Sequence, residues 1–186
     1  MPELPEVEVV RRKLDGWLRG ATLSAVACAD ALIVRPRKKG GLVGFRRALE
    51  GRRIEAVERK GKWLRLLLDD GTRFFAHLGM TGDFEEIAPG EPPPRFARAT
   101  FVATRRGKAR RFAYVDPRRL GHLEASAEDL RGWKTLGPDA LEGGVDPAVL
   151  AAAIARRKKQ TIKELVLDQT VVAGVGNIYA AESLWR

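Results

Sequence analysis

The chain has 186 residues, 45% of them hydrophobic, which is enough to bury a core and predicts a globular protein. It carries 34 Lys and Arg against 24 Asp and Glu, a formal net charge of +10. No charged leader precedes an apolar stretch, and no window approaches about 18 apolar residues. These features exclude a signal peptide and a membrane span.

Basic residues gather in three stretches: RPRKK (35–39), RRGKARR (105–111) and RRKK (156–159). Such clusters favour a polyanionic partner such as nucleic acid. A soluble protein with solvated basic faces explains the composition equally well, so sequence motifs must decide between this reading and nucleic-acid binding. Cys28 is the only cysteine, which leaves no disulfide and no cysteine-based zinc site. Its apolar surroundings predict a core residue, and the reducing cytoplasm is the expected location.

The first two thirds of the chain have mainly the pattern of strands. Pro5 and the apolar residues that recur from Val7 to Leu18 predict a helix over about 5–18. Alternation predicts strands over 22–28 and 53–59, with an irregular basic loop between them. Asp70-Gly71 predicts a hairpin of strands 62–68 and 72–78, and a further strand pair, 99–104 and 109–115, follows a proline-rich loop.

The remainder has the pattern of helices, expected over 127–133, 147–157, 162–168 and 177–185, with Asp146 as the cap of the second. Because strands precede helices instead of alternating with them, we expect an α+β protein of two domains, 1–124 and 125–186.

Five stretches then stand out: PELPEVE (2–8), RKGKW (59–63), HLGMTG (77–82), DPRRLG (116–121) and KKQTIKELVLDQTVVAGVGNIYAAE (158–182). Together and in this order they resemble the formamidopyrimidine-DNA glycosylase and endonuclease VIII family of base-excision repair enzymes. The resemblance covers essentially the whole chain. It implies an N-terminal β-sandwich with flanking helices, followed by a helix-two-turn-helix domain, here incomplete.

The opening residues carry the chemistry that the resemblance implies. Removal of Met1 would expose the secondary amine of Pro2, a fraction of which is neutral at pH 7 and can attack C1′ of a damaged nucleotide. Glu3 matches the general acid/base and Glu6 the second acidic position. For Glu8 we expect only a favourable charge at the helix N-terminus.

Lys62 matches the essential lysine that contacts phosphate and donates a proton in β-elimination, whereas Lys60 is expected to be solvated. His77 heads a matched motif, and a phosphate or sugar contact and a satisfied core histidine remain equally open for it.

An enzyme that flips a base out of a duplex must fill the hole that it leaves. The resemblance implies that Met80 fills this void, that Arg118 pairs with the orphaned base, and that Leu120 lies where the formamidopyrimidine branch usually has phenylalanine. A usual His-x-His pattern reads Phe96-Ala97-Arg98 here. Of these, Arg98 can replace a phosphate contact and Phe96 cannot.

The Gly-rich run before the last helix matches the helix-two-turn-helix, where helix amides can face a phosphate. Lys159 and Asn177 match its phosphate-binding positions, with Lys163 as a weaker candidate. For Glu182 we expect support of Asn177 or of the helix end.

The family usually continues with a zinc finger of four cysteines, which this sequence cannot build. We therefore expect no cofactor in this chain, which would be a shortened family member or a fragment. Fewer phosphate contacts would weaken DNA affinity.

The leading hypothesis is a bifunctional DNA glycosylase and AP lyase, monomeric, nucleoid-associated and without membrane contact. It would act on double-stranded DNA that contains oxidised purines (8-oxoguanine, formamidopyrimidines) or abasic sites. A non-catalytic binder of damaged or abasic DNA is the alternative, and a basic RNA- or ribosome-associated protein explains the charge but not PELPE.

Overall fold

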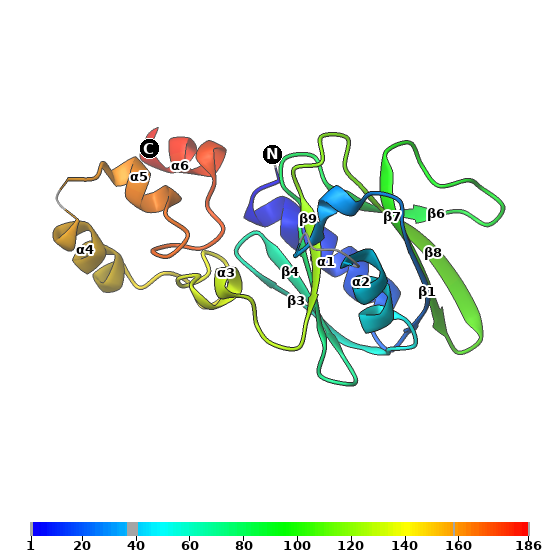
Figure 1. Cartoon of the computed structure of the whole chain (residues 1–186). Coiled ribbons are helices and arrows are strands. Elements are labelled where there is room, and N and C mark those ends of the chain that lie inside the picture. Colours follow the sequence, from blue (N-terminus) through cyan, green and yellow to red (C-terminus); the bar gives the residue numbers. More distant parts are fainter. Residues whose placement is uncertain (1, 37–40, 158, 186) are drawn as a thin grey trace.

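The computed structural model describes residues 2–36, 41–157 and 159–185. Two sheets face each other, with strand orders β1-β7-β8-β6 and β2-β9-β5-β4-β3, and a helical region follows them along the chain (Figure 1). The fold is α+β, as predicted. The strands are β1 (Thr22–Cys28), β2 (Val34–Arg35), β3 (Ile54–Lys60), β4 (Trp63–Leu68), β5 (Arg73–His77), β6 (Asp83–Ile87), β7 (Ala97–Arg105), β8 (Lys108–Val115) and β9 (His122–Ser126).

Aromatic side chains from both sheets fill the space between them. Phe74 of β5 lies 5.6 Å from Phe45 and 5.7 Å from Phe101 of β7, measured between ring centroids. Phe101 stacks on Phe112 of β8 at 4.9 Å. All four rings are buried, so this cluster joins the two sheets into one core.

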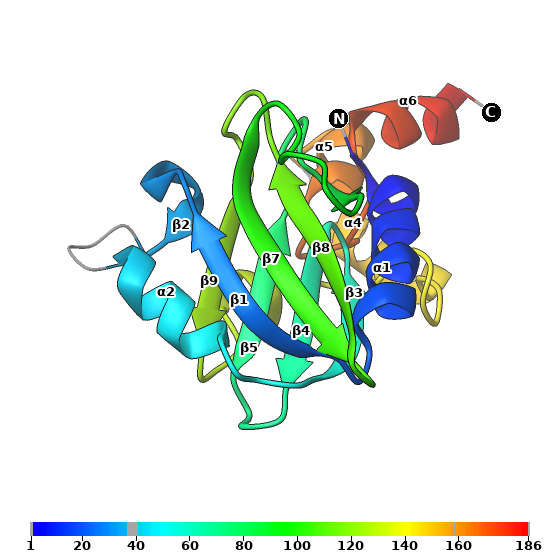
Figure 2. The same cartoon turned by 90° about the vertical axis from the view of Figure 1, so that its right-hand side faces the viewer.

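Helix α1 (Leu4–Leu18) runs along one side of the sandwich (Figure 2). Its predicted apolar face is confirmed, because Val7, Leu14 and Leu18 are fully buried. Glu3 is the N-cap residue, so the helix begins one residue before Pro5. Its first turn is stabilised by a capping box in which Glu3 and Glu6 are the reciprocal partners.

The prediction of an irregular loop between the first two expected strands was wrong. This segment contains the short helix η1 (Ala31–Ile33), strand β2 and helix α2 (Gly41–Leu49). Two glycines lower the helix propensity of α2, but burial of Phe45 and Leu49 against the sandwich compensates. The basic stretch 35–39 lies partly outside the described residues.

The other strands lie within a residue or two of their predicted positions, and strands β6 and β9 are additional. The helix expected over 127–133 is shorter and lies later, as α3 (Arg131–Lys134). Trp133 of this helix is buried against the sandwich and lies 5.7 Å from the Phe75 ring.

Residues 131–185 form what we call the helical part. It comprises α3, α4 (Pro147–Arg156), α5 (Ile162–Leu167) and α6 (Asn177–Trp185). The predicted cap is confirmed, because Asp146 accepts a hydrogen bond from the Ala148 amide at 2.8 Å. A nine-residue turn, 168–176, joins α5 to α6 and brings the start of α6 to the N-terminus of the chain (Figure 1). Within the described ranges, no helix is long and apolar enough to cross a membrane.

Candidate active site

The N-terminal segment lies between the sandwich and the helical part. Pro2 is half-buried and borders a cavity of about 340 Å³, which is lined among others by Glu6, Lys13, Leu78, Thr81 and Asp83. Met1 lies outside the described residues. The ring of Pro2 therefore borders a cavity that helix α1 and the loop 78–82 of the sandwich also line.

Glu3 is buried, with 1% of its surface exposed, and its carboxylate receives three backbone N–H groups at the start of α6. The donors are Gly176 at 2.8 Å, Ile178 at 2.8 Å and Tyr179 at 3.2 Å. Free amides and the helix dipole make such a helix end a site for anions. The helical part thus fixes the orientation of the Glu3 carboxylate.

Two glycines of the 168–176 turn make this contact possible. A Cβ atom on Gly176 would lie 2.3 Å from Cδ of Glu3. Gly174 has a φ of +106°, and its carbonyl accepts a hydrogen bond from the Leu4 amide at 3.1 Å. The glycines of the GVGN motif therefore allow the backbone to approach the N-terminal segment closely.

Glu6 is exposed, and its carboxylate accepts a hydrogen bond from the Glu3 amide at 2.9 Å. This contact holds the backbone between Pro2 and α1. Glu6 therefore supports Glu3 directly, one helical turn away, as its spacing in the sequence suggested.

Lys62 lies on the turn between β3 and β4 and is half-buried. Burial lowers the pKa of its ammonium group, and the negative charge of Glu3 acts in the opposite direction. Burial and, to a lesser degree, the charge of Lys62 lower the pKa of His77. Lys62 is therefore within electrostatic range of both Glu3 and His77.

His77 is half-buried at the end of β5, beside Trp63 of β4 and His122 of β9. Its Nδ1 atom accepts a hydrogen bond from the Gly79 amide at 3.1 Å, and its ring stacks on His122 at 5.5 Å and meets Trp63 edge-on at 5.0 Å. These contacts fix the orientation of the ring, and the two roles expected for it, a phosphate or sugar contact and a satisfied core histidine, both stay predictions. His77 also shapes the loop that presents Met80.

Two loops, 78–82 and 116–121, join through the buried carboxylate of Asp116. Asp116 accepts hydrogen bonds from the Thr81 hydroxyl at 2.7 Å, the Arg118 amide at 3.2 Å and the Gly121 amide at 2.8 Å. Sequence reasoning missed Asp116, although an Asp before Pro is a turn signal that could have indicated it.

The joined loops expose the side chains expected to enter DNA. Met80 is 39% exposed, Leu120 is 48% exposed, and Arg118 is exposed as well. A Cβ atom on Gly79 would lie 2.5 Å from the carbonyl carbon of Leu120, so the backbones of the two loops are in contact. The three predicted side chains are thus brought together on one surface.

Arg98 differs from its expected role as a phosphate contact. Its guanidinium donates to the carbonyl of Asp116 at 2.8 Å and to that of Pro117 at 3.2 Å, and it pairs with Asp30 at 3.7 Å. Only 13% of the side chain is exposed. Arg98 therefore supports the loop that carries Arg118.

Two charged residues near the site were assigned wrongly. Lys60 is not freely solvated, because its ammonium group donates to the Leu136 carbonyl at 2.9 Å. Glu8 is more than a charge at a helix end: its carboxylate is buried and accepts hydrogen bonds from Arg11, Arg12 and Arg59. Arg11 and Arg12 lie three and four residues after Glu8, so helical spacing alone brings them close to it. Arg59 is 51 residues away in the sequence, and only the fold brings it to Glu8.

The remaining predicted residues lie on the helical part. Lys159, Lys163 and Asn177 are exposed, and Asn177 is the first residue of α6, as predicted. We expected Glu182 to support Asn177 or the end of the helix, but it is the Glu3 carboxylate that accepts the amides at the start of α6. Within the described part of the chain, Glu182 makes no hydrogen bond or ion pair.

The residues present do not fit a zinc ion. The described part of the chain has no cluster of three or more His, Cys, Asp or Glu side chains that could hold a metal. The thiol of Cys28 is half-buried, its pKa is raised by burial, and it donates to the carbonyls of Asp30 and Arg98.

Fold and site together define a β-sandwich protein of the helix-two-turn-helix class, in which the turn between two helices holds the N-terminal segment. Residues 1–123 match the sequence profile of the formamidopyrimidine-DNA glycosylase N-terminal domain, and residues 136–186 match that of the formamidopyrimidine-DNA glycosylase H2TH domain. The chain belongs to the formamidopyrimidine-DNA glycosylase family.

Individual relatives agree with this assignment. Formamidopyrimidine-DNA glycosylase of Nocardioides sp. is 40% identical over 195 residues, which cover all of this chain and 63% of that protein. A crystal structure of LlFpg with THF-DNA and an inhibitor superposes with a TM-score of 0.86 at 30% identity, over 99% of this chain and 67% of that one. MutM in complex with DNA containing carbocyclic 8-oxo-G gives a TM-score of 0.85 at 30% identity, over 99% and 67%. The chain thus spans slightly less than two thirds of the first relative.

Proposed function

We propose that this chain is a base-excision repair DNA glycosylase with AP lyase activity, which acts through the amine of Pro2. The observation that carries the proposal is the arrangement of Pro2, Glu3 and Lys62. Pro2 borders a cavity, the Glu3 carboxylate beside it is fixed by three amides, and Lys62 is within electrostatic range. A nucleophile, an oriented carboxylate and an ammonium group are the components that this chemistry requires.

In the proposed glycosylase step, the free Pro2 nitrogen attacks C1′ of the damaged nucleotide, and the bond from C1′ to the base breaks. The base leaves with the electron pair of that bond and takes up a proton. The Pro2 nitrogen passes its proton through the Glu3 carboxylate to the ring oxygen, the bond from C1′ to that oxygen breaks, and C1′ and the Pro2 nitrogen form an iminium. The iminium carries a permanent positive charge and withdraws electrons from C2′.

In the proposed lyase step, C2′ loses a proton to the Glu3 carboxylate, and the bond from C3′ to its phosphate oxygen breaks with the electron pair on that oxygen. Lys62 contacts the phosphate and supplies a proton in this elimination. Water then hydrolyses the iminium and releases the Pro2 amine. Met80 is proposed to fill the space of the flipped nucleotide, Leu120 to wedge between bases and Arg118 to pair with the orphaned base. Lys159 and Asn177 are proposed to bind phosphates.

The proposed substrate is duplex DNA with an oxidised purine or an abasic site. The name of the curated relative and the complex of MutM with 8-oxo-G-containing DNA support this choice. Strand cleavage on duplexes that carry 8-oxoguanine, compared with duplexes that carry oxidised pyrimidines, tests it.

Borohydride trapping tests the chemistry. A chain whose mass shows that Met1 has been removed should form a covalent adduct with abasic duplex DNA at low salt when borohydride reduces the iminium. A matched chain with a short N-terminal extension, in which Pro2 is an amide, should bind the same DNA without an adduct. Failure of the processed chain to form the adduct would leave only the binding function.

A further inference from the structure

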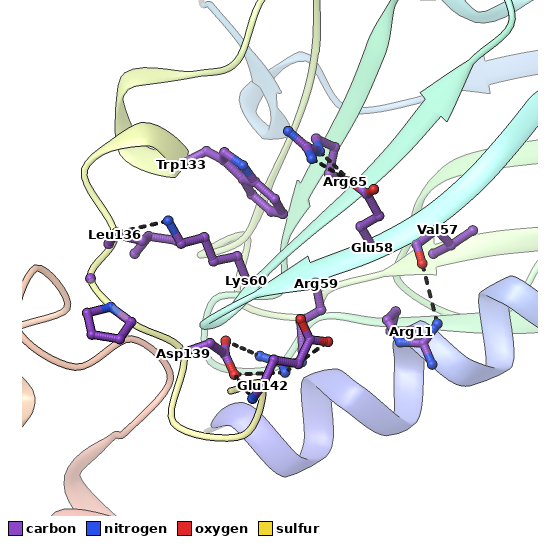
Figure 3. Close-up of a pocket in the computed structure, with 12 residues that line it drawn as sticks. Arg11, Val57, Glu58, Arg59, Lys60, Arg65, Trp133, Leu136, Asp139 and Glu142 are labelled. Carbon is purple, nitrogen blue, oxygen red and sulfur yellow. Dashed lines mark hydrogen bonds and ion pairs between the residues drawn. The ribbon is translucent and has the colours of Figure 1, made fainter. Parts of the chain in front are cut away.

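The guanidinium of Arg59 lies at the junction of three segments: helix α1, the β3–β4 turn and the segment 136–142 of the helical part (Figure 3). The Arg59 side chain has no exposed surface. Its Nε donates to the Glu8 carboxylate on α1 at 3.1 Å. Its Nη1 donates to the Gly61 carbonyl at 3.1 Å, one residue before Lys62.

The strongest contact of Arg59 is with Asp139 in the segment 136–142. The two form a bidentate pair, with Nη1 to Oδ2 at 2.6 Å and Nη2 to Oδ1 at 3.0 Å (Figure 3). Such a pair requires the planar fork of arginine, which lysine does not provide.

Asp139 in turn holds the β3–β4 turn. Its Oδ2 accepts a hydrogen bond from the Gly61 amide at 2.7 Å, and its Oδ1 accepts from the amides of Leu141 and Glu142 at 2.9 and 3.0 Å. Burial alone would raise the pKa of the Asp139 carboxyl, but Arg59 and these amides outweigh it and lower the pKa. Asp139 is thus a carboxylate with its partners in place.

Backbone contacts continue from Asp139 to the candidate active site. Asp139 pairs with Ala173 as a β-bridge, and the Ala140 amide donates to the Ala173 carbonyl at 3.0 Å. Gly174, the next residue, accepts from the Leu4 amide, and Gly176 donates to Glu3. The contacts form a closed ring that runs from α1 through Arg59 and Asp139 to the 168–176 turn and back to α1.

We propose that Arg59 and Asp139 are positioning residues that set the distance between Lys62 and the N-terminal segment, by locking the β3–β4 turn and α1 to the same stretch of the helical part. This inference rests on the proposed function for its kinetic effect. Within the described part of the chain, neither Arg59 nor Asp139 makes a hydrogen bond or ion pair with Pro2 or Glu3. Because a displacement of about 1 Å can slow a positioned reaction by about a hundredfold, loss of the lock should reduce rate more than affinity.

The test compares Arg59→Lys and Asp139→Asn with the matched control Arg65→Lys. Arg65 also has a largely buried guanidinium between two carboxylates, Glu58 and Asp129, but it makes no contact in the ring. Single-turnover cleavage of abasic duplex DNA should slow by about ten- to a hundredfold in the two ring variants. Affinity for the same DNA should change by less than about threefold, and Arg65→Lys should keep the wild-type rate.

Hydrogen exchange provides a readout that needs no activity. Amides at 60–62 and 173–177 should exchange faster in Asp139→Asn than in the wild type, whereas Arg65→Lys should leave them unchanged. The Asn variant keeps the shape of Asp139, which guards against an Arg59 variant that does not fold. Unchanged amide exchange in Asp139→Asn would overturn the positioning role. Cleavage rates that fall in all three variants only in proportion to their melting temperatures would overturn it as well. A wild type that forms no borohydride adduct but shows the exchange pattern would refute the proposed function alone.

Discussion

Glu3 and Glu8 lie on the same end of helix α1, yet their partners give them different tasks. The Glu3 carboxylate accepts hydrogen bonds from three backbone amides at the start of α6, next to the proposed nucleophile. The Glu8 carboxylate instead accepts hydrogen bonds from the side chains of three arginines. Burial alone would raise the pKa of Glu8, but the arginines outweigh it and lower the pKa from 4.5 to about 2. One carboxylate is thus oriented for chemistry and the other contributes to stability.

The lowered pKa of Glu8 predicts a pH dependence of folding. Because the folded pKa is below the unfolded one, Glu8 stabilises the protein fully above pH 4.5, and this contribution is lost as the pH falls to about 2. We expect Glu8→Gln to lose about 1–3 kcal/mol of unfolding free energy at neutral pH and to flatten this part of the pH profile. Urea unfolding across the acid range measures both. Glu55→Gln, at an exposed position on β3, is the control, and an equal flattening in it would contradict the assignment.

Lys62 predicts a second pH effect, on rate. Burial lowers its pKa below the ordinary value of 10.5, so proton donation by Lys62 should decline at a lower pH than for an exposed lysine. Lys62→Arg stays protonated and should lose this alkaline decline while being slower overall by about a hundredfold. Single-turnover strand cleavage from about pH 6 to about pH 9.5 measures it. The same decline in Lys62→Arg would show that another group causes it.

The start of α6 and the turn before it work as one element. The turn supplies glycines where the backbone approaches Glu3 and Leu4, and the helix supplies the amides that hold the carboxylate. Gln169 stabilises the turn from within, because its side chain accepts from the Gly174 amide at 2.9 Å and donates to the Val175 carbonyl at 2.9 Å. Backbone groups of this element therefore fix the position of the N-terminal segment through Glu3 and Leu4.

Gly176→Ala tests this element. The new methyl would lie 2.3 Å from Cδ of Glu3, so either the carboxylate or the turn must move. We expect the variant to lose about 1–3 kcal/mol of stability and at least about tenfold in adduct formation. Gly16→Ala, at a helix position with nothing within 4 Å, should instead gain about 0.5–1 kcal/mol and keep the wild-type rate. Equal rates in the two variants would argue against the close approach.

Across the whole molecule, the basic stretches lie at different ends. Helix α1 starts at the site, and 15 residues later, about 22 Å along its axis, the Arg19 carbonyl accepts a hydrogen bond from Arg105 at the β7–β8 hairpin. The hairpin stretch 105–111 is therefore remote from Pro2 (Figure 2). Lys159 belongs to the helical part, between α4 and α5.

This placement predicts which lysines contribute to DNA binding. Affinity for an abasic duplex should fall steeply between about 50 and about 200 mM salt, because phosphate contacts release counterions. Lys159→Gln should reduce the slope of log affinity against log salt by about one. Lys108→Gln, an exposed charge at the remote hairpin, should leave it unchanged. An equal reduction by both would mean that charge alone, irrespective of position, determines binding.

Local patterns were sufficient for much of the fold. Helix α1, the hairpin around Asp70-Gly71 and the Asp146 cap depend on residues within a few positions of each other, so periodicity and turn chemistry predicted them. Helix α2 was missed because its glycines oppose a helix, and only burial against the sandwich outweighs them. The motif residues were found through family resemblance, and their proximity in space was not readable from spacing.

The sequence by itself determined the α+β class and the family, and it supplied the residues proposed to react and to face DNA, because these depend on local propensity and on ordered motifs. Only the tertiary structure decided which charges face the site and which support it. Arg98 was expected to contact phosphate, Lys60 to be solvated and Glu8 to favour a helix end, yet each finds a partner distant in the sequence. Their roles depend on burial and on pairing between distant residues, and neither of these leaves a periodic pattern in the sequence from which it could be predicted.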